Sequence, residues 1–173
     1  MYNNLKVSES NSLKAVIEEL LEWCEKKEKE GELGRTFFNE PIIESKMEKW
    51  EAENGVKIPE SYKEWLRFSE KCQIDGTTAT FWGSDEFNSE YVPDDLIVVG
   101  EIIGDGQVVC FSKAEGVFVE YYEGNIQNRM ENFNEIIKKI FVNTNANLGL
   151  SRKTLELFME FNKKYMKNEK EDN

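Results

Sequence analysis

The stretch LIVVGEIIGDGQVVCFSKAEGVFVEYY, residues 96–122, does most to set the fold of this chain. It is rich in β-branched and aromatic residues, and it is divided by turn-forming residues at Gly104-Asp105-Gly106 and at Lys113-Ala114-Glu115-Gly116. This pattern predicts strands joined as hairpins. The expected strands, with one more upstream, are Thr78–Trp82, Leu96–Ile103, Gln107–Ser112 and Gly116–Tyr122. Because they follow one another directly, the sheet should be antiparallel.

Helical patterns lie upstream of these strands. Apolar residues recur at steps of three and four within residues 12–30, which predicts an amphipathic helix with Leu13, Val16, Ile17, Leu20, Leu21 and Cys24 on its apolar face. A second helix is expected over Glu44–Asn54, with Ile43, Met47 and Trp50 on one side and Gly55 as its stop. Pro59 suits the start of a third, which should turn Tyr62, Trp65 and Leu66 inward.

Further helices are expected after the strands. Asn132 followed by Glu135 resembles a capping box, and Phe133–Phe141 has helical spacing. A last helix is expected at residues 151–166, whereas Asp85–Pro93 and Glu123–Met130 read as irregular loops. The order predicts an α+β fold: an antiparallel sheet of about five or six strands drawn from Thr78–Tyr122, with helices on one face and extra N- and C-terminal helices. One domain is expected over residues 1–173, with its core at about 43–141.

Several kinds of chemistry are excluded by the composition. The chain has no histidine, so His-activated nucleophiles and His-containing metal sites are impossible. Its three cysteines are far apart, which favours buried free thiols over a disulfide or zinc site. Glu101 and Glu120 could be considered as an acid–base pair, but no nucleophile or basic group lies near them in the sequence. We therefore expect no enzyme activity, no cofactor and no metal.

The net charge of −12 is concentrated in the middle of the chain. Residues 73–128 contain eleven acidic residues and one base, Lys113, which gives −10 for that third. Such a surface repels nucleic acid phosphates, so no direct nucleic acid partner is expected. The acids could serve solubility alone, or they could form a docking face for a protein, because aromatic residues are interleaved with them. The candidate docking residues are Trp82, Asp85, Glu86, Phe87, Tyr91, Asp94, Asp95, Asp105, Tyr121 and Glu123.

Membrane association is not expected from this sequence. No apolar run approaches the roughly 20 residues that a membrane span requires. The first ten residues do not form a secretory signal pattern, so we expect a cytoplasmic protein.

The region from Ile43 to Leu66, IESKMEKWEAENGVKIPESYKEWL, resembles the opening of the SUKH superfamily. That group includes fungal cell-wall regulators and bacterial toxin-immunity proteins. Its opening consists of an amphipathic helix, a glycine, a short extended link, a Leu-Pro pair and a helix with an early tyrosine. Here the marker residues are Gly55, Ile58, Pro59 and Tyr62. Tyr91–Pro93, the three expected strands of residues 96–122 and Asn132–Ile136 resemble later parts of the family pattern, so the resemblance covers roughly residues 43–141.

The resemblance implies a non-catalytic protein-binding module. Its first implied function is that of a bacterial immunity protein, or antitoxin, which binds and neutralises a cognate polymorphic toxin such as a nuclease. An acidic partner would suit the positive active site of such a nuclease. The alternatives that stay open are a regulatory or scaffold module for an endogenous protein, and a small-ligand sensor that uses the concave sheet face.

Overall fold

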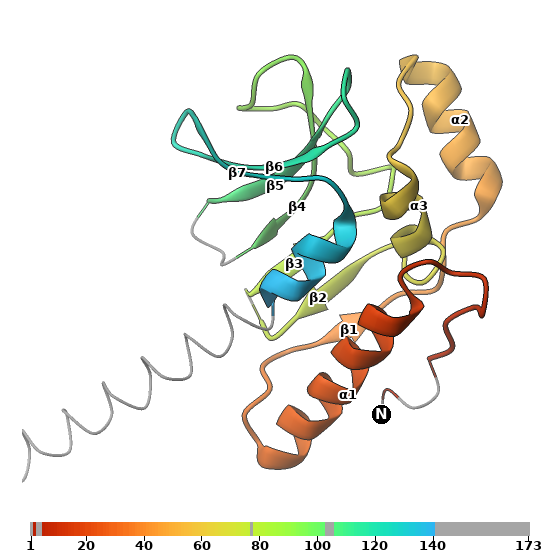
Figure 1. The fold of residues 1–173 in the computed structure, drawn as a ribbon, viewed down its shortest axis with the longest axis vertical. Helices are drawn as coiled ribbons and strands as arrows, with labels where there is room; N and C mark the ends of the chain where they lie inside the picture. The colour runs from red at the N-terminus through yellow and green to blue at the C-terminus, as the bar shows by residue number, and fades with distance from the viewer. Residues whose placement is uncertain (1, 3–4, 77, 103–105, 141–173) are drawn as a thin grey trace, which may run out of the picture. The chain divides into compact units, whose positions relative to one another are not determined.

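The centre of the fold is a seven-stranded antiparallel sheet, seen in a computed structural model that describes residues 2, 5–76, 78–102 and 106–140 (Figure 1). The strands lie side by side in their order along the chain: β1 (Phe37–Phe38), β2 (Cys72–Ile74), β3 (Ala79–Phe81), β4 (Leu96–Ile102), β5 (Val108–Ser112), β6 (Phe118–Tyr122) and β7 (Asn125–Met130). Each strand is antiparallel to its neighbours. The α+β class and the antiparallel sheet are therefore confirmed.

The sheet extends beyond the region from which its strands were expected. β1 and β2 precede Thr78, and β7 occupies most of the segment Glu123–Met130 that was expected to be a loop. β7 was missed because its first five side chains are exposed and mostly polar, as an edge strand allows. Glu123 and Gly124 have φ values of 46° and 83°, and this left-handed two-residue turn directs the chain back along β6.

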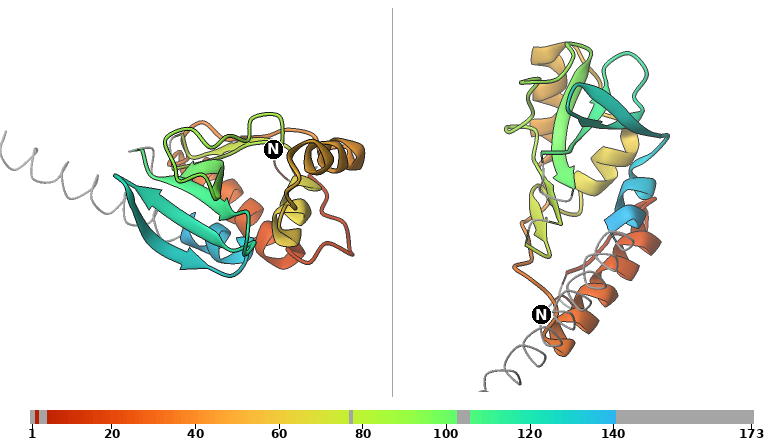
Figure 2. Two further views of the ribbon diagram at one scale, coloured as in Figure 1. Left: turned by 90° about the horizontal axis from the view of Figure 1, so that it is seen from above. Right: turned by 90° about the vertical axis from the view of Figure 1, so that its left-hand side faces the viewer.

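Helices cover one face of the sheet, which we call the inner face (Figure 2). They are α1 (Lys14–Glu30), α2 (Glu44–Asn54), α3 (Glu60–Leu66) and a helical segment at residues 133–140. The predicted apolar face of α1 is buried, as are Tyr62, Trp65 and Leu66 of α3. Ile43 differs from the prediction, because its side chain is 66 % exposed where the chain enters α2. The helix expected at residues 151–166 lies outside the described residues, so the single domain over residues 1–173 stays a prediction.

The start of the helical segment at residues 133–140 is built differently from the expected capping box. The backbone N–H of Phe133 donates to Ser61 Oγ at 3.1 Å, and Glu135 Oε1 accepts from the N–H of Glu131. Asn132 Oδ1 has no hydrogen-bond partner among the described residues. Tertiary contact with α3 therefore replaces the local Asn132 cap.

The marker residues of the sequence Gly55–Tyr62 have clear structural roles. Gly55 ends α2 in the left-handed conformation, with φ of 64°. Pro59 immediately precedes α3, and the ring of Tyr62 is fully buried between that helix and the sheet. The Tyr62 hydroxyl lies 2.8 Å from the carbonyl oxygen of Trp82 and 3.0 Å from that of Val99. Burial raises the pKa of this hydroxyl well above its usual value, so it stays protonated and can donate.

Two groups of charges hold the helices in place. Glu51 of α2 is buried and accepts from Lys57 Nζ at 2.6 Å, Lys63 Nζ at 2.7 Å and the N–H of Ile58 at 3.0 Å. Burial alone would raise the pKa of this carboxyl, but the three hydrogen bonds outweigh it and lower the pKa to about 2. On the sheet, buried Glu120 is bound by Lys139 of the helical segment at 2.5 Å. These pairs leave no isolated buried carboxylate at either position.

Candidate functional site

The face of the sheet opposite these helices, which we call the outer face, carries its own apolar cluster. Leu96 and Val98 of β4, Cys110 of β5 and Val119 of β6 are buried there. The partly buried residues packed against them are Trp82, Val92, Val108 and Tyr121. No residue of a described helix belongs to this cluster, whereas the inner-face cluster draws on all of the described helices. The cluster therefore packs only against strands and loops in the described part of the chain.

An open hollow of about 440 Å³ lies on this outer face. Its lining comes from the segment 82–92, strands β4 to β6, and the turns that adjoin them: Trp82, Asn88, Glu90, Tyr91, Val92, Val98, Gly106, Val108, Tyr121, Tyr122, Glu123 and Gly124. Register explains why Val108 and Tyr121 meet there, since the two residues are paired between β5 and β6. The lining thus combines three valines, four aromatic residues and two acidic residues.

The loop that carries Glu90 and Tyr91 is fixed to the sheet by hydrogen bonds. The N–H of Val98 donates to the carbonyl of Asn88 at 2.8 Å, and Ser89 Oγ donates to the carbonyl of Leu96 at 2.7 Å. Asn88 Oδ1 also accepts from the N–H of Glu90 at 3.2 Å. These bonds place the loop at the free side of the first half of β4, so the hollow has a defined wall.

Tyr91 has two unfavourable features. Its φ is 63°, in the left-handed region that a bulky side chain rarely adopts, and its side chain is 95 % exposed. A left-handed conformation costs about 1–2 kcal/mol for a residue with a Cβ. Because the ring is exposed, its burial contributes little stabilisation to offset that strain.

The carboxylates of Glu90 and Glu123 have no ion-pair partner among the residues that the structure describes, and no basic residue lines the hollow. Other acids of the middle third are neutralised locally. Glu86 pairs with Lys71 at 2.7 Å, and Glu115 pairs with Arg129. Within the described residues, the hollow therefore combines acidic residues that have no ion-pair partner with apolar residues.

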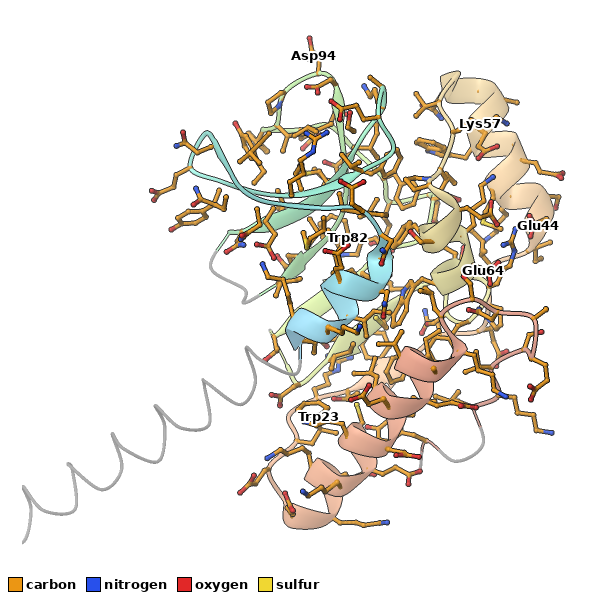
Figure 3. All side chains as sticks on the ribbon, in the orientation of Figure 1. Trp23, Glu44, Lys57, Glu64, Trp82 and Asp94 are labelled. Atoms are coloured by element: carbon orange, nitrogen blue, oxygen red, sulfur yellow. The ribbon has the colours of Figure 1, made fainter. Side chains whose placement is uncertain are left out.

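Four of the candidate docking residues come together here: Trp82, Tyr91, Tyr121 and Glu123. Asp94 and Asp95 do not join them, because they lie in the turn before β4, at the end of the sheet opposite the β6–β7 turn. Figure 3 shows Asp94 at the top of the molecule, well apart from Trp82. The acids of the middle third are thus divided between two ends of the sheet.

Asp85, Glu86 and Phe87 lie away from the hollow. Asp85 and Glu86 are exposed in the loop after Trp82. Phe87 packs on the inner side of the fold, with its ring centroid 5.2 Å from that of Trp50 and 5.8 Å from that of Tyr62. Phe87 therefore packs against the inner core and does not line the hollow. Asp105 lies outside the described residues.

Glu90, Tyr122 and the valines of the hollow were absent from the candidate docking residues. Strand alternation could have found Val108, because a residue two positions before Cys110 shares its face. Glu90 precedes the predicted Tyr91 directly, and its position depends on how the loop folds over the sheet. Cross-strand pairing of β6 with β7 was not anticipated, so the turn at Glu123–Gly124 was not placed beside Tyr121.

The two carboxylates considered for acid–base chemistry lie on opposite faces. Glu101 pairs with Val108, which faces outward, whereas Glu120 pairs with Val109, which belongs to the inner core. They cannot act on one substrate atom together. All three cysteines are free and buried, and burial raises the pKa of the Cys24 and Cys110 thiols to about 12.

The structure also bears on metal binding and on membrane crossing. Within residues 2, 5–76, 78–102 and 106–140, no group of three or more Cys, Asp or Glu side chains is arranged to hold a metal ion. In the same part of the chain, no helix has the length and apolar character needed to cross a membrane.

Comparison with known proteins identifies the family. A search of curated proteins finds no match to the chain. The family defined as SMI1 / KNR4 (SUKH-1) matches residues 41–139. This range contains the Gly55–Tyr62 markers, strands β2 to β7 and nearly all of the helical segment that closes the inner face. Because the match covers more than half of the 173 residues, the chain belongs to the SMI1 / KNR4 (SUKH-1) family.

Proposed function

We propose that this chain is a non-catalytic protein-binding module, and that it acts as a bacterial immunity protein that neutralises a cognate toxin by direct contact. The observation that carries the proposal is the outer face, where an apolar cluster lies beside aromatic residues and two acidic residues that have no ion-pair partner in the described part of the chain. An apolar centre with aromatic anchors and a charged rim is the usual composition of a specific protein interface. The toxin as partner is inferred from the family, and the surface agrees with it.

The partner should be basic. The chain carries −12 overall, and Glu90 and Glu123 beside the hollow have no ion-pair partner among the described residues. Opposite charge steers association and accelerates it, whereas a nucleic acid backbone would be repelled. A toxin that itself binds phosphate groups, such as a nuclease, has the required positive surface. We place the meeting of the two proteins in the cytoplasm, where such a toxin would act.

The absence of histidine from the whole chain and the separation of Glu101 from Glu120 support a role without catalysis. Neutralisation would then follow from occupying the toxin's surface. For tight binding, such an interface must bury roughly 800 Å² on each partner. The hollow and the apolar residues around it would supply the centre of that area.

The experiment begins with the gene beside that of this chain. If it encodes a large secreted protein with a C-terminal toxin domain, that domain is expressed in a bacterial host with and without this chain. We expect the chain to restore growth and to co-purify with the domain in a stoichiometric complex. Absence of such a gene, or growth that stays arrested although both proteins are present, would contradict the immunity function and favour an endogenous partner.

A matched pair of variants connects this result to the outer face. Glu90→Lys/Glu123→Lys alters the hollow, whereas Glu48→Lys/Glu53→Lys alters exposed positions on α2, and both variants carry the same net charge. Only the first should reduce protection. An equal loss with both would mean that total charge, and not this surface, determines binding.

A further inference from the structure

The hollow on the outer face lies beside an apolar cluster of the sheet. Its lining includes four aromatic residues, Trp82, Tyr91, Tyr121 and Tyr122, and two acidic residues, Glu90 and Glu123. We propose that it binds the guanidinium group of an arginine side chain presented by the partner protein. This inference rests on the proposed function, because it specifies how the outer face recognises a basic partner.

The chemistry of the lining favours a cation with a flat, weakly hydrated surface. Aromatic faces attract cations, with about 0.5–1 kcal/mol at exposed sites and about 2 kcal/mol when water is excluded. A guanidinium group stacks on aromatic rings and also donates hydrogen bonds in a fork that matches a carboxylate. An ammonium group is a compact and strongly hydrated charge, so lysine should bind more weakly than arginine.

Charge compensation gives a second reason. Glu90 and Glu123 approach the hollow from separate elements, the loop 83–95 and the β6–β7 turn. Neither carboxylate has an ion-pair partner in the described part of the chain, although Glu86, Glu115 and Glu120 all have one. A single cation in the hollow would be attracted by both.

The conformation of Tyr91 gives a third reason. Tyr91 borders the hollow in a loop that is bonded to β4, although its φ is left-handed and the residue is 95 % exposed. Strained residues with exposed side chains persist where the surrounding structure fixes them, and they cluster at binding sites. An arginine that enters the hollow would cover the ring of Tyr91 and bury surface that is exposed in the free chain.

A second copy of this chain is a poor occupant for the hollow. Two molecules that each carry −12 would place acidic outer faces against each other. Arg129, a basic residue of the adjoining strand β7, is already paired with Glu115. The hollow is therefore suited to a different protein of opposite charge.

The test uses the full chain labelled with ¹⁵N and a capped Gly-Arg-Gly peptide as the probe. The matched controls are the same peptide with citrulline, which keeps the shape but not the charge, and with lysine. We expect the indole N–H signal of Trp82, assigned with Trp82→Phe, to shift with a Kd on the order of millimolar, as suits a single side chain. The indole signals of Trp23, Trp50 and Trp65 should not move. The citrulline peptide should cause no shift, and the lysine peptide should bind severalfold more weakly.

The variant Glu90→Gln/Glu123→Gln should bind the arginine peptide about fivefold more weakly than the natural chain, and Tyr91→Ala about threefold more weakly. Two results would overturn the proposal: equal shifts with the arginine and citrulline peptides, or shifts at Asp94 and Asp95 that are unchanged in these variants.

The two proposals can also fail separately. If the peptide binds as described but the toxin domain is not neutralised, the immunity function is wrong and the arginine site stands. If Glu90→Gln/Glu123→Gln and Tyr91→Ala each neutralise the toxin as well as the natural chain does, the arginine site is wrong and the immunity function stands.

Discussion

The hydroxyl of Tyr62, on the inner side of the sheet, lies 2.8 Å from the carbonyl oxygen of Trp82, whose side chain lines the hollow on the outer side. The same hydroxyl lies 3.0 Å from the carbonyl oxygen of Val99, which also accepts the N–H of Trp82 at 2.9 Å. A core residue of α3 therefore fixes the backbone at the point where β3 leads into the binding surface. The family markers around Pro59 and the candidate site are connected through this contact.

Replacing Tyr62 by Phe should remove this contact while keeping the ring in the core. A buried hydrogen bond contributes about 1–2 kcal/mol when one partner is left unsatisfied, so we expect the free energy of unfolding to fall by that amount. Tyr62→Ala should cost about 3–5 kcal/mol, because it also removes a fully buried ring. Urea denaturation measures both values. Unchanged stability in Tyr62→Ala would mean that the ring is not buried and that the placement of α3 is wrong.

Replacing Gly100 by Ala should disturb the pairing of β3 with β4. A Cβ at this position would overlap the Thr80 carbonyl oxygen and the Phe81 ring. We expect a loss of about 2 kcal/mol or more, since the clash includes backbone that cannot move aside. Gly31→Ala is the comparison, because Gly31 has a left-handed φ of 70° but open space around it, and should cost only about 1 kcal/mol. If thermal denaturation shows that Gly31→Ala lowers the stability more than Gly100→Ala does, this account is contradicted.

The pH dependence of stability should contain a contribution from Glu51. Its pKa in the folded chain is about 2, below the ordinary value of 4.5, so the folded state favours the ionised carboxyl. This contribution is complete above pH 4.5 and is lost as the pH falls from about 4.5 through about 2. Its size is about 3 kcal/mol by linkage.

Glu51→Gln should therefore be less stable than the natural chain at pH 7, and the difference should shrink as the pH approaches 2. Glu48→Gln changes an exposed acid of the same helix and should give a difference close to zero throughout. Denaturant titrations at several pH values supply the comparison. If the difference in free energy of unfolding between Glu51→Gln and the natural chain stays constant from pH 7 to pH 2.5, the lowered pKa of Glu51 is contradicted.

Tyr91→Asn should have opposite effects on stability and on binding. Asn tolerates a positive φ better than Tyr, so the variant should gain up to about 1 kcal/mol of stability. Loss of an anchoring ring should weaken the complex with the toxin domain by tenfold or more, mainly through faster dissociation. A variant with unchanged stability and full affinity would mean that Tyr91 is an ordinary exposed loop residue.

Most of the fold could be predicted where local chemistry and tertiary structure agree. Helix α2 was predicted with its observed bounds, because Gly55 provides a left-handed end and Pro59 prevents a continuous helix through the link. The strands of residues 96–122 were predicted from their β-branched content. β7 was not, because an exposed edge strand needs only a backbone ladder and the Glu123–Gly124 turn, which leaves almost no apolar pattern in the sequence.

The candidate site was predictable only in part. Trp82, Tyr91, Tyr121 and Glu123 could be identified as aromatic and acidic residues of one region, and the fold brings them around one hollow. The position of Glu90 and the inward turn of Phe87 could not be predicted. They depend on the hydrogen bonds of Asn88 and Ser89 to β4 and on packing against Trp50, contacts between segments distant in sequence.

The central claim, that the outer face binds a basic protein, is tested most directly by association kinetics with the toxin domain at several salt concentrations. Surface-based kinetics should be measured for the natural chain, for Glu90→Lys/Glu123→Lys and for the control Glu48→Lys/Glu53→Lys, which has the same net charge. We expect the association rate of the natural chain to fall steeply with salt, because exposed charges are screened over about 10 Å at 0.1 M. The outer-face variant should associate more slowly, with a flatter salt dependence. The control should keep most of the natural chain's association rate and most of its salt dependence. Equal rates and equal salt dependence in all three proteins would contradict the claim and place the docking surface elsewhere.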